Sequence, residues 1–100
     1  MDYILESRVL WGTYDLFGTV PEIMRQLVDD CCIHPTRGDV ETRVIPGLAL
    51  EKEPDTTGLE KVHFLKTGGS LLQALEDLKQ RYRFDFGIGS NMEFWTRPMW

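Results

Sequence analysis

The residues with the most reactive side chains are two adjacent cysteines, Cys31 and Cys32, with His34 shortly after them and His63 farther along. Structural zinc sites take four such ligands, with the cysteines usually separated by a few residues, so adjacent thiols do not match that spacing. Neighbouring Cα atoms lie about 3.8 Å apart, which is shorter than a relaxed disulfide requires. We therefore expect no bound metal, no cofactor and no internal disulfide, and we expect Cys31 to be a buried apolar residue of a helix.

Cys32 and His34 are also candidates for a nucleophile and its base. Such a pair needs an orienting acid and an oxyanion hole, and the sequence supplies neither in a recognisable pattern. The segment 66–70, Lys-Thr-Gly-Gly-Ser, precedes a predicted helix, where free backbone amides attract phosphate. Because it lacks the Gly-Lys-Ser/Thr of a Walker motif, we interpret it as a turn that supplies Ser70 as the helix N-cap.

Carboxylates are numerous, but their spacing does not form a calcium-loop pattern. A glycosidase pair would have to converge across a cleft, and nothing in the sequence indicates such convergence. We interpret the following acidic residues as solvated surface groups: Asp29, Asp30, Glu51, Glu53, Asp55, Glu76 and Asp77. The sequence therefore predicts no catalytic, cofactor-binding or metal-binding residue and no enzymatic activity.

The composition is that of one globular domain spanning residues 1–100, with 42% hydrophobic and 27% charged residues. The net charge of −5 makes nucleic acid a poor candidate partner, because phosphate contacts require cationic side chains. No apolar run approaches the ~20 residues of a membrane span. Asp2 and Glu6 near the N-terminus argue against a secretory signal. We expect neither a nucleic-acid partner nor a membrane partner.

One amphipathic helix is predicted over residues 19–32, where apolar side chains recur with the 3.6-residue period. Thr19 and Glu22 form a T-x-x-E capping box at its start. Pro21 falls in the first turn, where a missing N–H is harmless, and Pro35 ends the segment.

A second helix is predicted over residues 70–82, again with one apolar stripe. Ser70 and Gln73 form an S-x-x-Q capping box. Cations at residues 79 and 81 suit the C-terminal end of the helix dipole.

Alternating apolar and polar residues predict five strands, near residues 5–11, 44–50, 62–65, 84–89 and 92–97. Pro46 and Gly47 interrupt the second of these and indicate an edge strand or a bulge. A tight turn at residues 89–91 joins the last two strands into a hairpin, and residues 51–58 form a loop.

The predicted order is therefore β-α-β-β-α-β-β, which is typical of an α+β domain. Each helix has a single apolar stripe. We expect both helices to pack on one face of a single, mainly antiparallel or mixed sheet.

Three stretches resemble one region of a family of siphophage tail proteins, the long multidomain proteins of the tail tip and baseplate hub. Residues 18–35 resemble the family's helix that ends in a V-D-x-N-C-x-N-P-like run, with Cys31 and His34 where the family pattern has asparagine. Residues 43–50 resemble its R-x-I-P-x-L-x-L strand. Residues 70–78 and 84–88 resemble its second helix and following strand.

This resemblance implies a structural role in a phage or prophage tail, as a small α/β insert excised from, or belonging to, a longer tail protein. It implies partners among other tail proteins, other domains of the same protein or a second copy, and a location in the virion tail or, before assembly, in the host cytoplasm. An edge strand at residues 44–50 is a candidate for pairing with a neighbour.

Two alternatives stay open: a peptide- or ligand-binding module whose groove is lined by Trp95 and Trp100, and a fragment of a tail-associated hydrolase. The apolar segment 94–100 either packs on its own domain or continues into a neighbour.

Overall fold

The computed structural model describes residues 10, 12–33, 45, 47–52 and 58–98. The α+β class is confirmed, and the described elements follow the order β-α-β-β-α-β-β, with the first strand at residues other than those predicted. That order is β1 (Thr13–Gly18), α2 (Val20–Val28), the π-helix η1 (Asp29–Ile33), β2 (Ala49–Leu50), β3 (Val62–Thr67), α4 (Leu71–Tyr82), β4 (Phe84–Ile88) and β5 (Glu93–Pro98).

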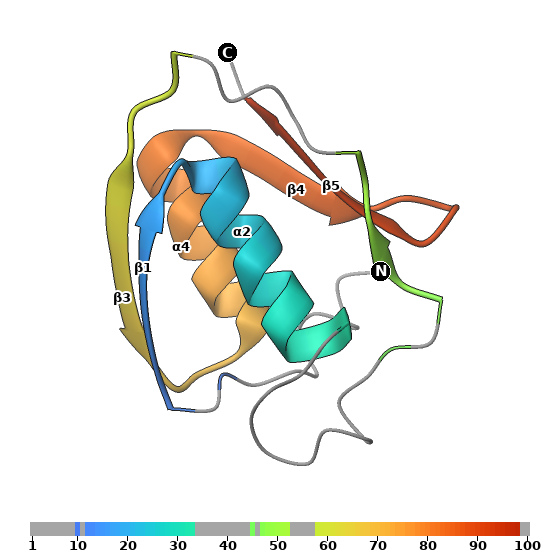
Figure 1. The fold of residues 1–100 in the computed structure, drawn as a ribbon, viewed down its shortest axis with the longest axis horizontal. Helices are drawn as coiled ribbons and strands as arrows, with labels where there is room; N and C mark the ends of the chain where they lie inside the picture. Colours follow the sequence, from blue (N-terminus) through green and yellow to red (C-terminus); the bar gives the residue numbers. More distant parts are fainter. Residues whose placement is uncertain (1–9, 11, 34–44, 46, 53–57, 99–100) are drawn as a thin grey trace.

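The strands form two sheets, where the sequence predicted one. Among the strands that the structure describes, β1 pairs antiparallel with β3 alone, whereas β2, β5 and β4 form a three-stranded mixed sheet in that order. Helices α2 and α4 lie side by side, with β1 and β3 along one side of them and the three-stranded sheet along the other (Figure 1). Two separate sheets can share one core here because α2 contacts β1 of the first sheet and β5 of the second.

The N-terminal signals of both helices are at the predicted residues. Ser70 Oγ accepts a hydrogen bond from the Gln73 amide at 3.1 Å, and the Gln73 side chain accepts one from the Ser70 amide. Glu22 likewise accepts from the Thr19 amide at 3.3 Å. The Thr19 hydroxyl is buried and makes no hydrogen bond within the described part of the chain. The second capping box is therefore the better satisfied of the two.

The first predicted helix changes its geometry before it ends. Its α-helical part stops at Val28, and residues 29–33 form one turn of π-helix. α-Helical spacing places only Cys31 on the apolar stripe, but in this wider turn both Cys31 and Cys32 are fully buried.

The first described strand is one that the sequence analysis missed. In β1, Tyr14 is buried, while Thr13, Asp15 and Phe17 are exposed. Because the exposed residue Phe17 is apolar, this segment lacks the alternation of apolar and polar residues that predicts a strand. The strand predicted over residues 5–11 lies outside the described residues except for Leu10, which is buried and not in a strand.

The later strands agree with prediction. The hairpin of β4 and β5 has Ile88 opposite Phe94, and its turn lies at residues 89–92, close to that predicted. β2 is an edge strand as expected, although it is only two residues long.

A single hydrophobic core joins both helices to both sheets. Ile23, Leu27, Leu75 and Phe94 are fully buried within it. In the described part of the chain, neither helix is long and apolar enough to cross a bilayer.

Candidate functional site

The outward face of β1 and β3 exposes two large apolar side chains. Phe17 is 69% exposed and Leu65 is 63% exposed. In the antiparallel register Phe17 lies opposite His63, and Leu65 lies opposite Asp15. These side chains share one face because alternate residues of a strand point to the same side. We call this surface the β1–β3 face, formed by Thr13, Asp15, Phe17, His63, Leu65 and Thr67.

Polar contacts across the two strands hold the β1–β3 face in register. The hydroxyls of Thr13 and Thr67 are 2.9 Å apart. His63 Nε2 pairs with the Asp15 carboxylate, and both side chains are more than half exposed. The apolar groups of Phe17 and Leu65 are therefore surrounded by hydrogen-bonding groups, as in the apolar centre and polar rim of many interfaces.

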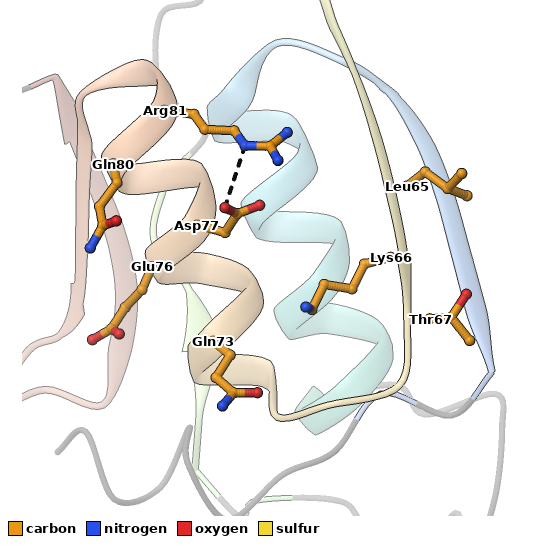
Figure 2. A pocket seen from close by; sticks show the side chains of 8 residues that line it. All are labelled: Leu65, Lys66, Thr67, Gln73, Glu76, Asp77, Gln80 and Arg81. Carbon is orange, nitrogen blue, oxygen red and sulfur yellow. Dashed lines mark ion pairs between the residues drawn. The ribbon is translucent and has the colours of Figure 1, made fainter.

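An open groove of about 560 Å³ lies between β3 and α4 (Figure 2). Its lining is mostly polar: Leu65, Lys66, Thr67, Gln73, Glu76, Asp77, Gln80 and Arg81. Lys66 points from β3 toward α4, whereas Leu65 points away from the helix (Figure 2). Arg81 Nε lies 3.4 Å from Asp77 Oδ1. The groove presents charges of both signs, which does not favour a simple anion or cation as its ligand.

The turn between β3 and α4 serves to start the helix, as the sequence predicted for segment 66–70. Gly68 and Gly69 have φ of 67° and 83°, a region that glycine enters without steric cost. The Gly68 amide donates to Gly12 O at 3.2 Å, and the Ser70 amide donates to Gln73. Two of the amides at this turn are thus used within the fold.

A second cluster joins β1 to η1. The Tyr14 hydroxyl donates a hydrogen bond to Asp30 and lies 3.9 Å from Cys31 Sγ. Burial, the hydrogen bond to Asp30 and the neighbouring Cys31 together raise the pKa of Tyr14 well above its usual range. The phenol therefore keeps its proton and acts as a donor that holds β1 against η1, and it is unsuited to act as a base.

A third cluster surrounds Glu51, which follows β2. Its carboxylate lies 2.7 Å from Arg97 Nη1 and accepts from the Thr96 amide at 3.0 Å. Its backbone carbonyl accepts from Arg25 Nη1 of α2 at 2.8 Å. The carboxylate holds the end of β2 against β5 and makes no contact typical of a catalytic acid.

The environment of Glu51 favours its ionised form. Partial burial acts to raise the pKa of the Glu51 carboxyl. The hydrogen bonds from Arg97 and Thr96 and the charges of Arg97 and Arg25 outweigh burial, so the pKa lies below its ordinary value. Sequence reasoning interpreted Glu51 and Asp30 as solvated surface groups, and for these two residues that interpretation is wrong. Their partners are far away in sequence, so no local pattern identifies them.

The structure separates the sequence candidates for metal binding and catalysis. Cys31 and Cys32 are fully buried, whereas His63 is exposed on the β1–β3 face. Within the described ranges, no group of three or more His, Cys, Asp or Glu side chains is arranged to hold a metal ion. His34, Glu53 and Asp55 lie outside the described residues.

The aromatic residues of the C-terminal segment pack on their own domain as far as the structure describes them. Phe94 is fully buried, and Trp95 covers Gly87 on the neighbouring strand. The Arg97 guanidinium lies 5.7 Å from the centre of the Trp95 ring. Trp100, the second aromatic residue of the expected groove, lies outside the described residues.

Comparisons of this chain with protein-family models, curated proteins and solved structures give no match. The β1–β3 face, with the groove beside it, is the surface that the geometry singles out.

Proposed function

We propose that this chain is a structural module of a phage or prophage tail that makes protein–protein contacts and performs no catalysis of its own. The observation that supports this proposal most is the exposure of Phe17 and Leu65 on the β1–β3 face. The tail setting comes from the resemblance of residues 18–35, 43–50, 70–78 and 84–88 to tail-tip and hub proteins.

Two exposed apolar side chains on a two-stranded sheet favour a contact role for a physical reason. A sheet of two strands is marginal by itself, and covering its open face and edges adds buried apolar area and hydrogen bonds. Tyr14 and Glu51 bond to neighbouring elements of the fold, and the exposed pair of His63 and Asp15 joins β3 to β1 on the β1–β3 face itself.

The structure also changes which edge is the better candidate for pairing. The edge predicted from the sequence, at residues 44–50, is described as a strand only over Ala49–Leu50. β3 extends over six residues and borders the open groove. We therefore assign the contact role to the β1–β3 face and the β3 edge.

The proposal is tested in two steps on phage particles that encode this chain. Mass spectrometry of purified tails should detect the chain. A phage with both Phe17→Lys and Leu65→Lys should lose the chain from its tails or fail to form tails, while the isolated variant keeps its circular dichroism spectrum, because both side chains are exposed.

Ser90→Lys is the matched control, since Ser90 is exposed at the turn of the other sheet. This control should assemble normally. Purified tails without the chain would contradict the tail assignment. Normal incorporation of the folded double variant would contradict the assignment of the contact role to the β1–β3 face.

A further inference from the structure

Among the described residues, β3 pairs with another strand along one edge of its backbone and not along the other, and the hydrogen bonds identify which residues face each edge. Gly68 donates to Gly12 in continuation of the β1–β3 register. In an antiparallel ladder, hydrogen-bonded and non-hydrogen-bonded pairs alternate. Val62, Phe64 and Lys66 therefore bond to β1, and the intervening residues 63, 65 and 67 direct their N–H and C=O groups to the opposite edge.

Those outward backbone groups belong to His63, Leu65 and Thr67. Within the described part of the chain, none of the three makes a backbone hydrogen bond to another element. Their side chains are exposed as well, with Leu65 at 63%. A long edge strand with an exposed apolar residue at its centre is a ready template for a further strand.

Beside this edge there is room for such a strand. The groove of about 560 Å³ separates β3 from the exposed side of α4, and it is open to solvent (Figure 2). An added strand would lie about 4.8 Å from β3. Its side chains would alternate between the β1–β3 face and the polar residues of α4.

We propose that the strand added to this edge is β3 of a second copy of this chain, antiparallel and related by a two-fold axis at Leu65. The proposal rests on the proposed function, because it names the partner for one part of the assigned contact surface, the β3 edge. In this register Leu65 lies opposite Leu65 of the other copy, and His63 lies opposite Thr67 of the other copy. All three outward residues then form hydrogen-bonded pairs, and each pair exchanges two backbone hydrogen bonds.

Symmetry and charge support a second copy as the occupant. In a two-fold interface the same surface of both copies is in contact, and here Leu65 of one copy pairs with Leu65 of the other at the centre. The groove has two cations, Lys66 and Arg81, and two anions, Glu76 and Asp77. This balance suits a partner with the same mixed charges better than a partner of one charge. The result would be a continuous four-stranded sheet, in the order β1-β3-β3-β1.

The proposal is tested by sedimentation equilibrium of the full chain over a range of concentrations. We expect a reversible monomer–dimer equilibrium. Leu65→Lys places like charges opposite each other at the two-fold axis and should raise the dimer Kd on the order of tenfold or more. Ser90→Lys is the matched control, because Ser90 is exposed at the turn of the other sheet, and it should leave Kd unchanged. Phe17→Lys separates edge pairing from face-to-face packing, because Phe17 lies on β1 away from the β3 edge, and edge pairing predicts a change in Kd of no more than about twofold.

A covalent readout uses single cysteine substitutions. Leu65→Cys should form a cross-linked dimer with a short bis-maleimide reagent, whereas Phe17→Cys should remain monomeric. The native Cys31 and Cys32 are fully buried, so the unmodified chain serves as the blank.

Three results would overturn the proposal. The first is a monomer at every concentration, and the second is a dimer whose Kd Leu65→Lys leaves unchanged. The third is an equal rise in Kd for Leu65→Lys and Phe17→Lys, which would indicate that the faces pack together. A monomer that still enters tails through the β1–β3 face would overturn self-pairing and leave the proposed function standing. Circular dichroism of each variant serves as the check that its fold is intact.

Discussion

Replacing Glu51 tests how β2 is held against β5. The carboxylate accepts from the Thr96 amide at 3.0 Å, and Thr96 is only 3% exposed. A buried N–H left without a partner costs about 1–3 kcal/mol, so Glu51→Ala should lower the free energy of unfolding by that amount at pH 7. Glu51→Gln keeps an acceptor but loses the charge, and should cost about 1 kcal/mol, the difference between a charged and a neutral hydrogen bond.

The effect of Glu51→Gln depends on pH in a defined direction. The pKa of Glu51 is lower in the folded chain than its ordinary value of 4.5, so its ionised form stabilises the fold. That stabilisation is fully present above the unfolded pKa and is lost as the pH falls through the folded pKa. The difference between native chain and variant should therefore be constant near neutral pH and shrink below about pH 4.5.

Urea unfolding, followed by tryptophan fluorescence at a series of pH values, measures this difference directly. Glu60→Gln is a matched control, because Glu60 is exposed and precedes β3, and it should leave the profile nearly unchanged. A Glu51→Gln difference that persists unchanged to the lowest pH, or a Glu51→Ala variant as stable as the native chain, would refute the role assigned to this carboxylate.

Three further predictions concern the backbone and are checked by urea unfolding. Gly87→Ala should destabilise the hairpin by about 1–3 kcal/mol, because the added Cβ would lie 2.6 Å from Trp95 Cζ2, and a smaller cost in a Trp95→Ala background would confirm that contact as the cause. Arg83→Gly should stabilise the chain by about 0.5–1 kcal/mol, because Arg83 ends α4 with φ of 59°, and an unchanged midpoint would contradict this. Ser70→Ala should cost about 1 kcal/mol, because its hydroxyl accepts from the Gln73 amide, and a loss no larger than that of an exposed mid-helix site would contradict the cap.

The sequence alone determined the features that depend on neighbours within a few residues. Residue spacing over short stretches of the sequence predicts the capping box of Ser70 and Gln73, the apolar stripe of α4 and the β4–β5 hairpin. The α+β class follows from the order of those elements. Short-range patterns of this kind report steric and hydrogen-bonding preferences that hold in any fold.

Only the tertiary structure decided how the described strands divide into two sheets and which edge of β3 has no partner among them. The partners of Glu51 and Tyr14 lie 45 and 16 residues away, so no local pattern predicts their bonds. The strand β1 escaped prediction because Phe17 faces outward, where alternation expects a polar residue. An exposed apolar side chain weakens the periodic pattern used to find strands, and here it also marks the surface assigned to protein contacts.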